Sequence, residues 1–88
     1  MQKINPKKYG LSYQTTIFKI ERGDVVIMKN RKSRIIMKDG YKILETARKI
    51  RKIEKSVKIT LQTNAPMCSK TKTFLEKNVI TIELIEQC

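Results

Sequence analysis

The chain has 88 residues, with 20 Lys and Arg, 8 Asp and Glu and no His, which gives a formal net charge of +12. This length supports one small domain, and 40% hydrophobic residues are enough to fold it, which excludes a disordered basic tail. A Cys/His zinc site needs four ligands and a catalytic triad usually needs histidine, whereas this chain has two cysteines and no histidine. The composition therefore favours a binding module for a polyanion, with no cofactor and no metal site, over an enzyme.

The positive charge is concentrated in the middle of the chain. Residues 1–28 hold five bases and two acids, residues 29–58 hold twelve bases and three acids, and residues 59–88 hold three of each. Charge that served only solubility would be spread more evenly. We therefore expect the middle third to make contacts and the last third to act as scaffold.

The lack of a recognisable targeting segment and the small number of cysteines predict an intracellular protein. No apolar run is long enough to span a membrane, and residues 1–10 lack the apolar centre of a signal peptide. Cys68 and Cys88 form no CxxC motif, and a secreted disulfide scaffold would be richer in cysteine. We predict free thiols, an intracellular location in cytoplasm or nucleus, and no membrane partner.

The first half of the chain predicts three strands. Residues 1–12 are expected to form an irregular basic arm, and residues 13–88 a single domain. Tyr13–Ile20 alternates in polarity, a polar turn follows, and Val25–Met28 is apolar, which together indicate a hairpin. Arg34–Lys38, with Ile35-Ile36-Met37 at its centre, suits a buried third strand.

From Gly40 onward the apolar period becomes helical. Apolar residues recur every three or four positions from Ile43 to Ile53, which predicts an amphipathic helix over Tyr41–Glu54. Val57–Thr63 alternates as a half-buried strand, residues 63–78 suit either a short helix or an ordered loop, and Val79–Ile85 predicts a closing strand. The expected fold class is α+β, a small mixed sheet packed by one basic helix, with or without a second short helix. The expected core comprises Ile43, Ala47, Ile50, Val57, Ile59, Leu61, Ile80, Ile82 and Leu84.

Two groups of bases are candidate phosphate contacts, one in the turn and strand after residue 28 and one on the predicted helix. Only Glu45 and Glu54 are available to pair bases along that helix, which favours polyanion binding over a merely solvated helix face. The basic turn is equally consistent with a sheet edge that lysines protect from pairing. The candidate nucleic-acid-binding residues are Lys29, Arg31, Lys32, Arg34, Lys38, Lys42, Arg48, Lys49, Arg51, Lys52 and Lys55.

Aromatic side chains are few, so we expect recognition to depend on backbone and shape more than on base identity. Tyr9, Tyr13 and Tyr41 lie beside polar or basic residues and are the better candidates for base stacking. Phe18 and Phe74 are expected in the core.

An enzymatic alternative rests on Asp24 and the later Ile36-Met37-Lys38, whose spacing is similar to that of restriction-endonuclease-like nucleases. That pattern needs a carboxylate two residues before the lysine to hold a metal ion, and Ile36 occupies the place. Cys68 has no histidine to activate it as a nucleophile. We therefore expect no catalytic residue.

Several segments between residues 34 and 85 also match a family pattern. They are a strand ending in glycine (Arg34–Gly40), a helix reading Gly40-x-x-Ile43-x-x-Thr46-Ala47, and the strands Val57–Thr63 and Val79–Leu84. This part of the chain resembles the Alba family of small basic DNA- and RNA-binding proteins. The helix that the family has between its first two strands has no counterpart here in residues 13–33. The resemblance implies nucleic-acid binding and often dimerisation.

Together these patterns predict a small basic protein that binds structured RNA through its phosphates, as a ribosomal or ribonuclease P-like ribonucleoprotein component. The expected partner is nucleic acid, with RNA favoured over DNA, together with other ribonucleoprotein proteins or a second copy of the chain. One alternative is a basic protein-interaction module that docks an acidic partner. The other is a catalytically degenerate nuclease-like domain that binds DNA.

Overall fold

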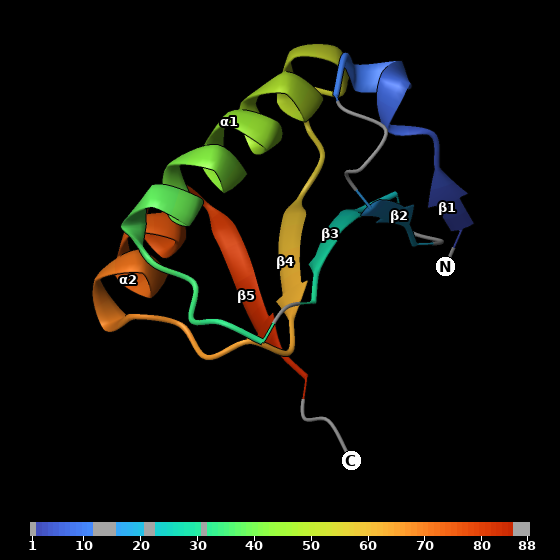
Figure 1. Ribbon diagram of the computed structural model, residues 1–88. Helices are drawn as coiled ribbons and strands as arrows, with labels where there is room; N and C mark the ends of the chain where they lie inside the picture. The colour runs from blue at the N-terminus through green and yellow to red at the C-terminus, as the bar shows by residue number, and fades with distance from the viewer. Residues whose placement is uncertain (1, 12–15, 21–22, 31, 86–88) are drawn as a thin grey trace.

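A five-stranded mixed sheet with both α-helices on one face makes up the fold (Figure 1). The structure is a computed structural model, and it describes residues 2–11, 16–20, 23–30 and 32–85. The elements in chain order are β1 (Gln2–Ile4), the 3-10 helix η1 (Pro6–Tyr9), β2 (Thr16–Lys19), β3 (Val25–Lys29), α1 (Met37–Ile53), β4 (Ile59–Thr63), α2 (Ser69–Lys77) and β5 (Ile80–Leu84). This architecture confirms the predicted α+β class.

The strands lie side by side in the order in which the chain forms them. β1, β2 and β3 are antiparallel neighbours, whereas β3, β4 and β5 run parallel to one another. Parallel neighbours require a crossover connection, which α1 and α2 supply. Each helix therefore starts near the carboxyl ends of the parallel strands and returns toward their amino ends.

The core lies between the sheet and the two helices. Ile17, Ile27 and Leu61 are paired in register across β2, β3 and β4, and all three are buried. Most of the predicted core is confirmed, because Ile43, Ala47, Ile50, Ile59, Leu61 and Ile80 are buried, and Val57 and Ile82 pack against the cluster. Leu84 was predicted wrongly: it is 56% exposed, because it ends β5 at the edge of the sheet.

The hairpin predicted before residue 29 is confirmed as β2 and β3, but the strand predicted over Arg34–Lys38 is wrong. α1 begins at Met37, four residues earlier than expected, and Ile35 makes only an isolated bridge to Met67. The Asp39 side chain accepts a hydrogen bond from the Ile36 N–H (3.1 Å), so Asp39 caps the helix from inside its first turn. The apolar run is thus divided between a buried loop residue and a helix start.

Residues 2–11 are more ordered than the irregular arm that the sequence predicted. β1 pairs with β2, and Pro6 begins η1, whose preceding Asn5 accepts a hydrogen bond from the Lys7 N–H (3.0 Å). Gly10 ends η1 with φ of +71°, a conformation that glycine adopts without strain. Tyr9 is buried in the core, so this segment is packed against the rest of the protein.

The region left open between helix and loop forms α2. Thr71 and Leu75 are its buried residues, and they are four positions apart on one helix face. The helix ends in a turn at Asn78 and Val79, where Val79 has φ of +60°. A β-branched residue rarely adopts this left-handed conformation, so the turn is strained.

Candidate nucleic-acid interface

The outer face of α1 carries the largest group of exposed bases. Because the apolar residues of α1 recur at helical spacing, they face the sheet and leave the intervening bases in solvent. A helix of 17 residues is about 25 Å long, which matches the rise of roughly seven base pairs. The exposed bases, called the α1 basic face below, are Lys38, Lys42, Arg48, Lys49 and Lys52.

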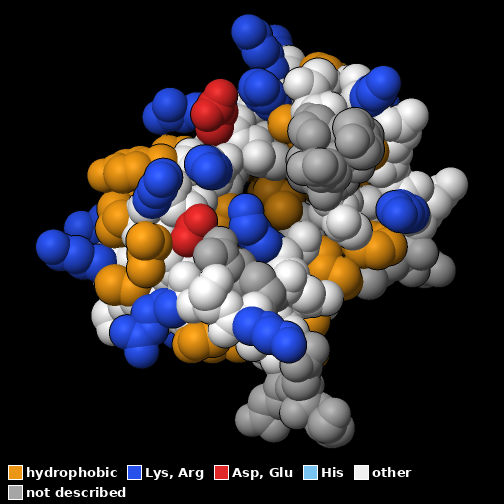
Figure 2. All heavy atoms as spheres, viewed as in Figure 1, with side chains coloured by type: hydrophobic (Ala, Val, Ile, Leu, Met, Phe, Trp, Pro, Cys, Tyr) orange, Lys and Arg blue, Asp and Glu red, His pale blue; other side chains and the backbone are white. Residues whose placement is uncertain are grey.

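Few acids offset these charges along α1. Glu45 is exposed within the same stripe, whereas Asp39 is half-buried at the helix start. Figure 2 shows the lysine and arginine side chains extending over α1 with few acidic side chains among them. These bases therefore create a positive electrostatic potential along the outer face of α1.

Three further candidate bases lie where β3 ends, at the carboxyl edge of the parallel strands. Lys29 is half-buried as the last residue of β3, and Lys32 and Arg34 are exposed in the loop that follows. Main-chain bonds of Ile35 hold this loop against the β4–α2 connection, from its N–H to Pro66 O (2.8 Å) and from Cys68 N–H to its carbonyl (3.1 Å). Arg31 lies outside the described residues.

Arg51 has a different position from the other candidate bases of α1. Its guanidinium donates hydrogen bonds to the carbonyl oxygens of Asn78 (3.0 Å) and Val79 (2.7 Å). These carbonyls end α2, where a positive charge also interacts favourably with the helix dipole. Arg51 therefore connects the two helices. Lys55, the last candidate base, is exposed in the turn after α1.

The three tyrosines proposed for stacking have different positions. Tyr9 is only 3% exposed and donates a hydrogen bond to Glu54, so its prediction as a stacking residue is wrong. Tyr13 lies outside the described residues. Tyr41 is 58% exposed and meets Phe74 edge-to-face, with ring centroids 5.1 Å apart.

Glu54 joins η1, β2 and the end of α1 in one polar network. Besides the Tyr9 hydroxyl, it accepts a hydrogen bond from Lys19 Nζ (2.9 Å). The hydrogen bond from Tyr9 and then that from Lys19 lower the pKa of Glu54. Burial, reinforced by the Glu54 carboxylate, raises the pKa of Tyr9 to about 12. Lys19 and Glu54 therefore hold the N-terminal segment rather than offering free charge.

Metal-ligating groups are sparse in the described parts of the chain. No group of three or more acidic or cysteine side chains gathers there as a cation site. Cys68 is a free, half-buried thiol that precedes α2, and the backbone N–H groups of Thr71 and Lys70 lower its pKa. Ile36 and Lys38 lie at the start of α1 and not on a strand, so the nuclease spacing proposed for them does not have the expected structural context.

Sequence reasoning missed the lysines of α2. Lys70 and Lys77 are exposed on either side of Phe74, four residues before it and three after it. This spacing places all three on one helix face, but it carries information only once residues 69–77 are known to be helical.

Comparison with known proteins gives a fold and no family. No protein-family model matches this sequence, and no curated protein is similar to it. Among solved structures, the fold is similar to that of EndoMS in complex with double-stranded DNA, with a TM-score of 0.66, 17% identity and coverage of 81% of this chain and 30% of the other. A repair endonuclease from Pyrococcus abyssi gives a TM-score of 0.66 at 12% identity, covering 81% of this chain and 31% of the other.

EndoMS without ligand is a third similar structure, with a TM-score of 0.65, 16% identity and coverage of 82% of this chain and 34% of the other. This chain thus has the fold of a part of these endonucleases and spans about a third of their length. Neither helix in the described ranges is long and apolar enough to cross a membrane.

These structures change two of the sequence-based predictions. The prediction that the protein is not an enzyme is contradicted, because the structures that share its fold are endonucleases. The preference for RNA over DNA finds no support among them, whereas the alternative of a nuclease-like DNA-binding domain does. The resemblance to the Alba family stays a prediction.

Proposed function

We propose that this protein is a nuclease-like domain that binds duplex DNA through its phosphates. The α1 basic face provides the main contact surface, and the exposed bases Lys32 and Arg34 at the carboxyl edge extend it beyond the start of α1. Each lysine or arginine that neutralises a phosphate releases a condensed counterion, which stabilises the complex without reading sequence.

The observation that carries the proposal is the exposed basic stripe along one helix of a nuclease fold. Five exposed bases follow a ridge of α1 on which Glu45 is the exposed acid. The similar fold of EndoMS, solved with double-stranded DNA, supports DNA as the polyanion. An acidic protein partner would satisfy the same charges, but the three similar structures described above do not point to one.

Fluorescence polarisation tests the proposal with a labelled blunt DNA duplex, a matched RNA duplex and heparin, each over a salt series. We expect DNA binding whose logarithm of affinity falls linearly with the logarithm of salt concentration, because counterion release controls it. Binding to DNA that is weaker than about 10⁻⁴ M at physiological salt would refute the proposal, since non-specific DNA binding is already at that level or tighter. Binding to heparin alone would identify a general polyanion site instead.

Cleavage is measured in the same mixtures, because the structural neighbours are endonucleases. The DNA is incubated with Mg²⁺ or Mn²⁺ and its products are separated by denaturing electrophoresis. Cleavage that Asp24→Asn removes would extend the proposal from binding to catalysis, since a carboxylate is the expected ligand of either cation.

A further inference from the structure

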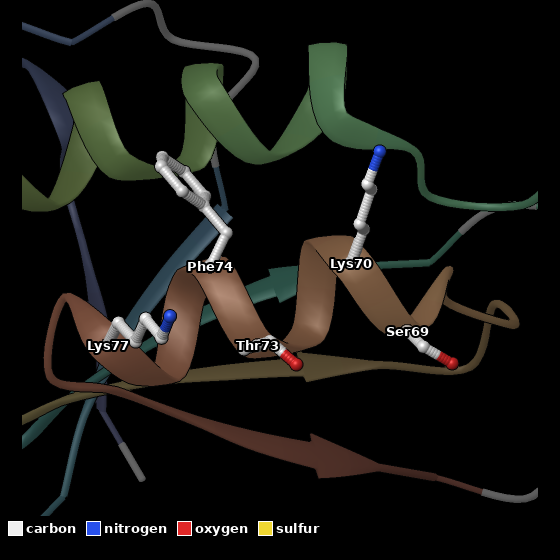
Figure 3. A pocket seen from close by; sticks show the side chains of 5 residues that line it. All are labelled: Ser69, Lys70, Thr73, Phe74 and Lys77. Carbon is white, nitrogen blue, oxygen red and sulfur yellow. The ribbon is translucent and has the colours of Figure 1, made fainter.

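A shallow groove along α2 is not explained by duplex binding along α1. It has a volume of about 470 Å³ and is lined by Ser69, Lys70, Thr73, Phe74 and Lys77. Figure 3 shows Phe74 and Lys70 pointing from α2 toward α1, with Ser69 and Thr73 on the other flank of the groove. This volume lies within the range of ordinary small-ligand sites.

An aromatic pair, half-buried Phe74 and exposed Tyr41, borders this groove. Phe74 lines it, and Tyr41 from α1 meets Phe74 at an interplanar angle of 76°. In such a perpendicular pair, each ring keeps at least one face that the other does not cover. Since Tyr41 is 58% exposed, its ring is accessible to a planar group from solvent.

Positive charge surrounds the two rings. Lys70 and Lys77 lie one turn before and one turn after Phe74, about 10 Å apart along the helix axis. Lys38 lies one turn before Tyr41 on α1, and Glu45 is the acid one turn after it. Two hydroxyls, those of Ser69 and Thr73, complete the rim with hydrogen-bonding groups.

We propose that this groove binds an unpaired nucleotide of single-stranded DNA next to the duplex on α1. The base stacks on the open face of Tyr41, and the phosphates on either side of it contact Lys70 and Lys77. Stacking on an aromatic ring and phosphate contact by lysines are the two general components of single-strand recognition. The site is continuous with the α1 basic face, because Lys38 belongs to that face and also lies one turn from Tyr41. This inference rests on the proposed function.

The test compares a blunt DNA duplex with the same duplex carrying a single-stranded DNA tail. We expect the tail to raise the affinity of the natural protein about tenfold, within the range of about 5- to 150-fold that one stacked base contributes. A 2-aminopurine in the tail should lose fluorescence on binding, because stacking on an aromatic ring quenches it. Equal affinity for tailed and blunt DNA, or unchanged fluorescence, would overturn the inference and leave duplex binding intact.

Variants at Tyr41 separate stacking from charge. Tyr41→Ala should abolish the gain from the tail and leave blunt-duplex affinity unchanged, whereas the matched control Tyr41→Phe keeps the ring and should keep the gain. Lys77→Ala should reduce the salt dependence of the affinity for tailed DNA and leave that for the blunt duplex unchanged. A gain that persists in Tyr41→Ala would overturn the role of the ring, and a larger gain from an RNA tail would overturn the assignment to DNA. If the natural protein did not bind the blunt duplex, that result would instead refute the proposed function.

Discussion

Arg48 and Arg51 are the same residue type on the same helix, three positions apart, yet the structure gives them different roles. Arg48 is exposed on the α1 basic face, whereas Arg51 is half-buried and bonded to two carbonyls at the end of α2. We predict that Arg48→Gln weakens DNA binding and leaves stability unchanged. Arg51→Gln should instead lower stability and leave the salt dependence of DNA binding nearly unchanged.

The size of the binding effect follows from counterion release. If all five bases of the α1 basic face contact phosphates, the slope of log affinity against log salt is about −4.5, and removing one contact changes it to about −3.6. If the natural protein and Arg48→Gln have equal affinity at 1 M salt, this difference in slope makes the variant bind about eightfold more weakly at 0.1 M salt. Fluorescence polarisation across a salt series measures both quantities.

The size of the stability effect follows from the two hydrogen bonds of Arg51. A half-buried charged donor that serves two backbone carbonyls contributes about 1–2 kcal/mol. In a domain of this size, each kcal/mol shifts Tm by about 4–8 °C, which thermal unfolding followed by circular dichroism resolves. Equal changes of salt slope in the two variants, or an unchanged Tm in Arg51→Gln, would refute the reasoning that separates binding charge from structural charge.

Three further predictions concern stability. Val79→Gly should raise stability by about 1 kcal/mol in thermal unfolding, because glycine adopts φ of +60° without the strain of a β-branched residue, and a lower Tm would contradict this. Gly40→Ala should lower stability by about 1 kcal/mol, because the added Cβ would lie 2.9 Å from Thr71 Cγ2, and Thr71→Ser should restore part of the loss in the double variant. Tyr9→Phe should cost about 1–2 kcal/mol by removing the hydrogen bond to Glu54. Because that bond lowers the pKa of Glu54, the stability it provides is present above the ordinary Glu pKa of 4.5 and is lost as pH falls below it. Urea unfolding at pH 7 and pH 3 should therefore show a smaller difference between Tyr9→Phe and the natural protein at the lower pH.

The periodicity of apolar residues predicted those helices and strands that have one buried face and one exposed face. The spacing of Ile43, Ala47 and Ile50 defined the buried face of α1, and so it also defined which bases of α1 are exposed. Alternation likewise predicted β4 and β5, because a strand with one covered face repeats every second residue. Local pattern failed at Ile35-Ile36-Met37, where three adjacent apolar residues have no period. The helix begins at Met37, and Asp39 caps its first turn.

The charge of +12 and its concentration in residues 29–58 are properties of the sequence alone, and they predicted a surface for a polyanion. The sequence also determined most of α1, because a helical face is set by residues three and four apart. Only the tertiary structure decided that Arg51 serves the end of α2, that Tyr9 is buried against Glu54, and that Tyr41 meets Phe74. These pairs are separated by 27, 45 and 33 residues, so no local periodicity relates them. The contacts of Arg51 and Tyr41 arise because the parallel order of β3, β4 and β5 places α1 beside α2 on one face of the sheet. The contact of Tyr9 arises because η1 packs against α1.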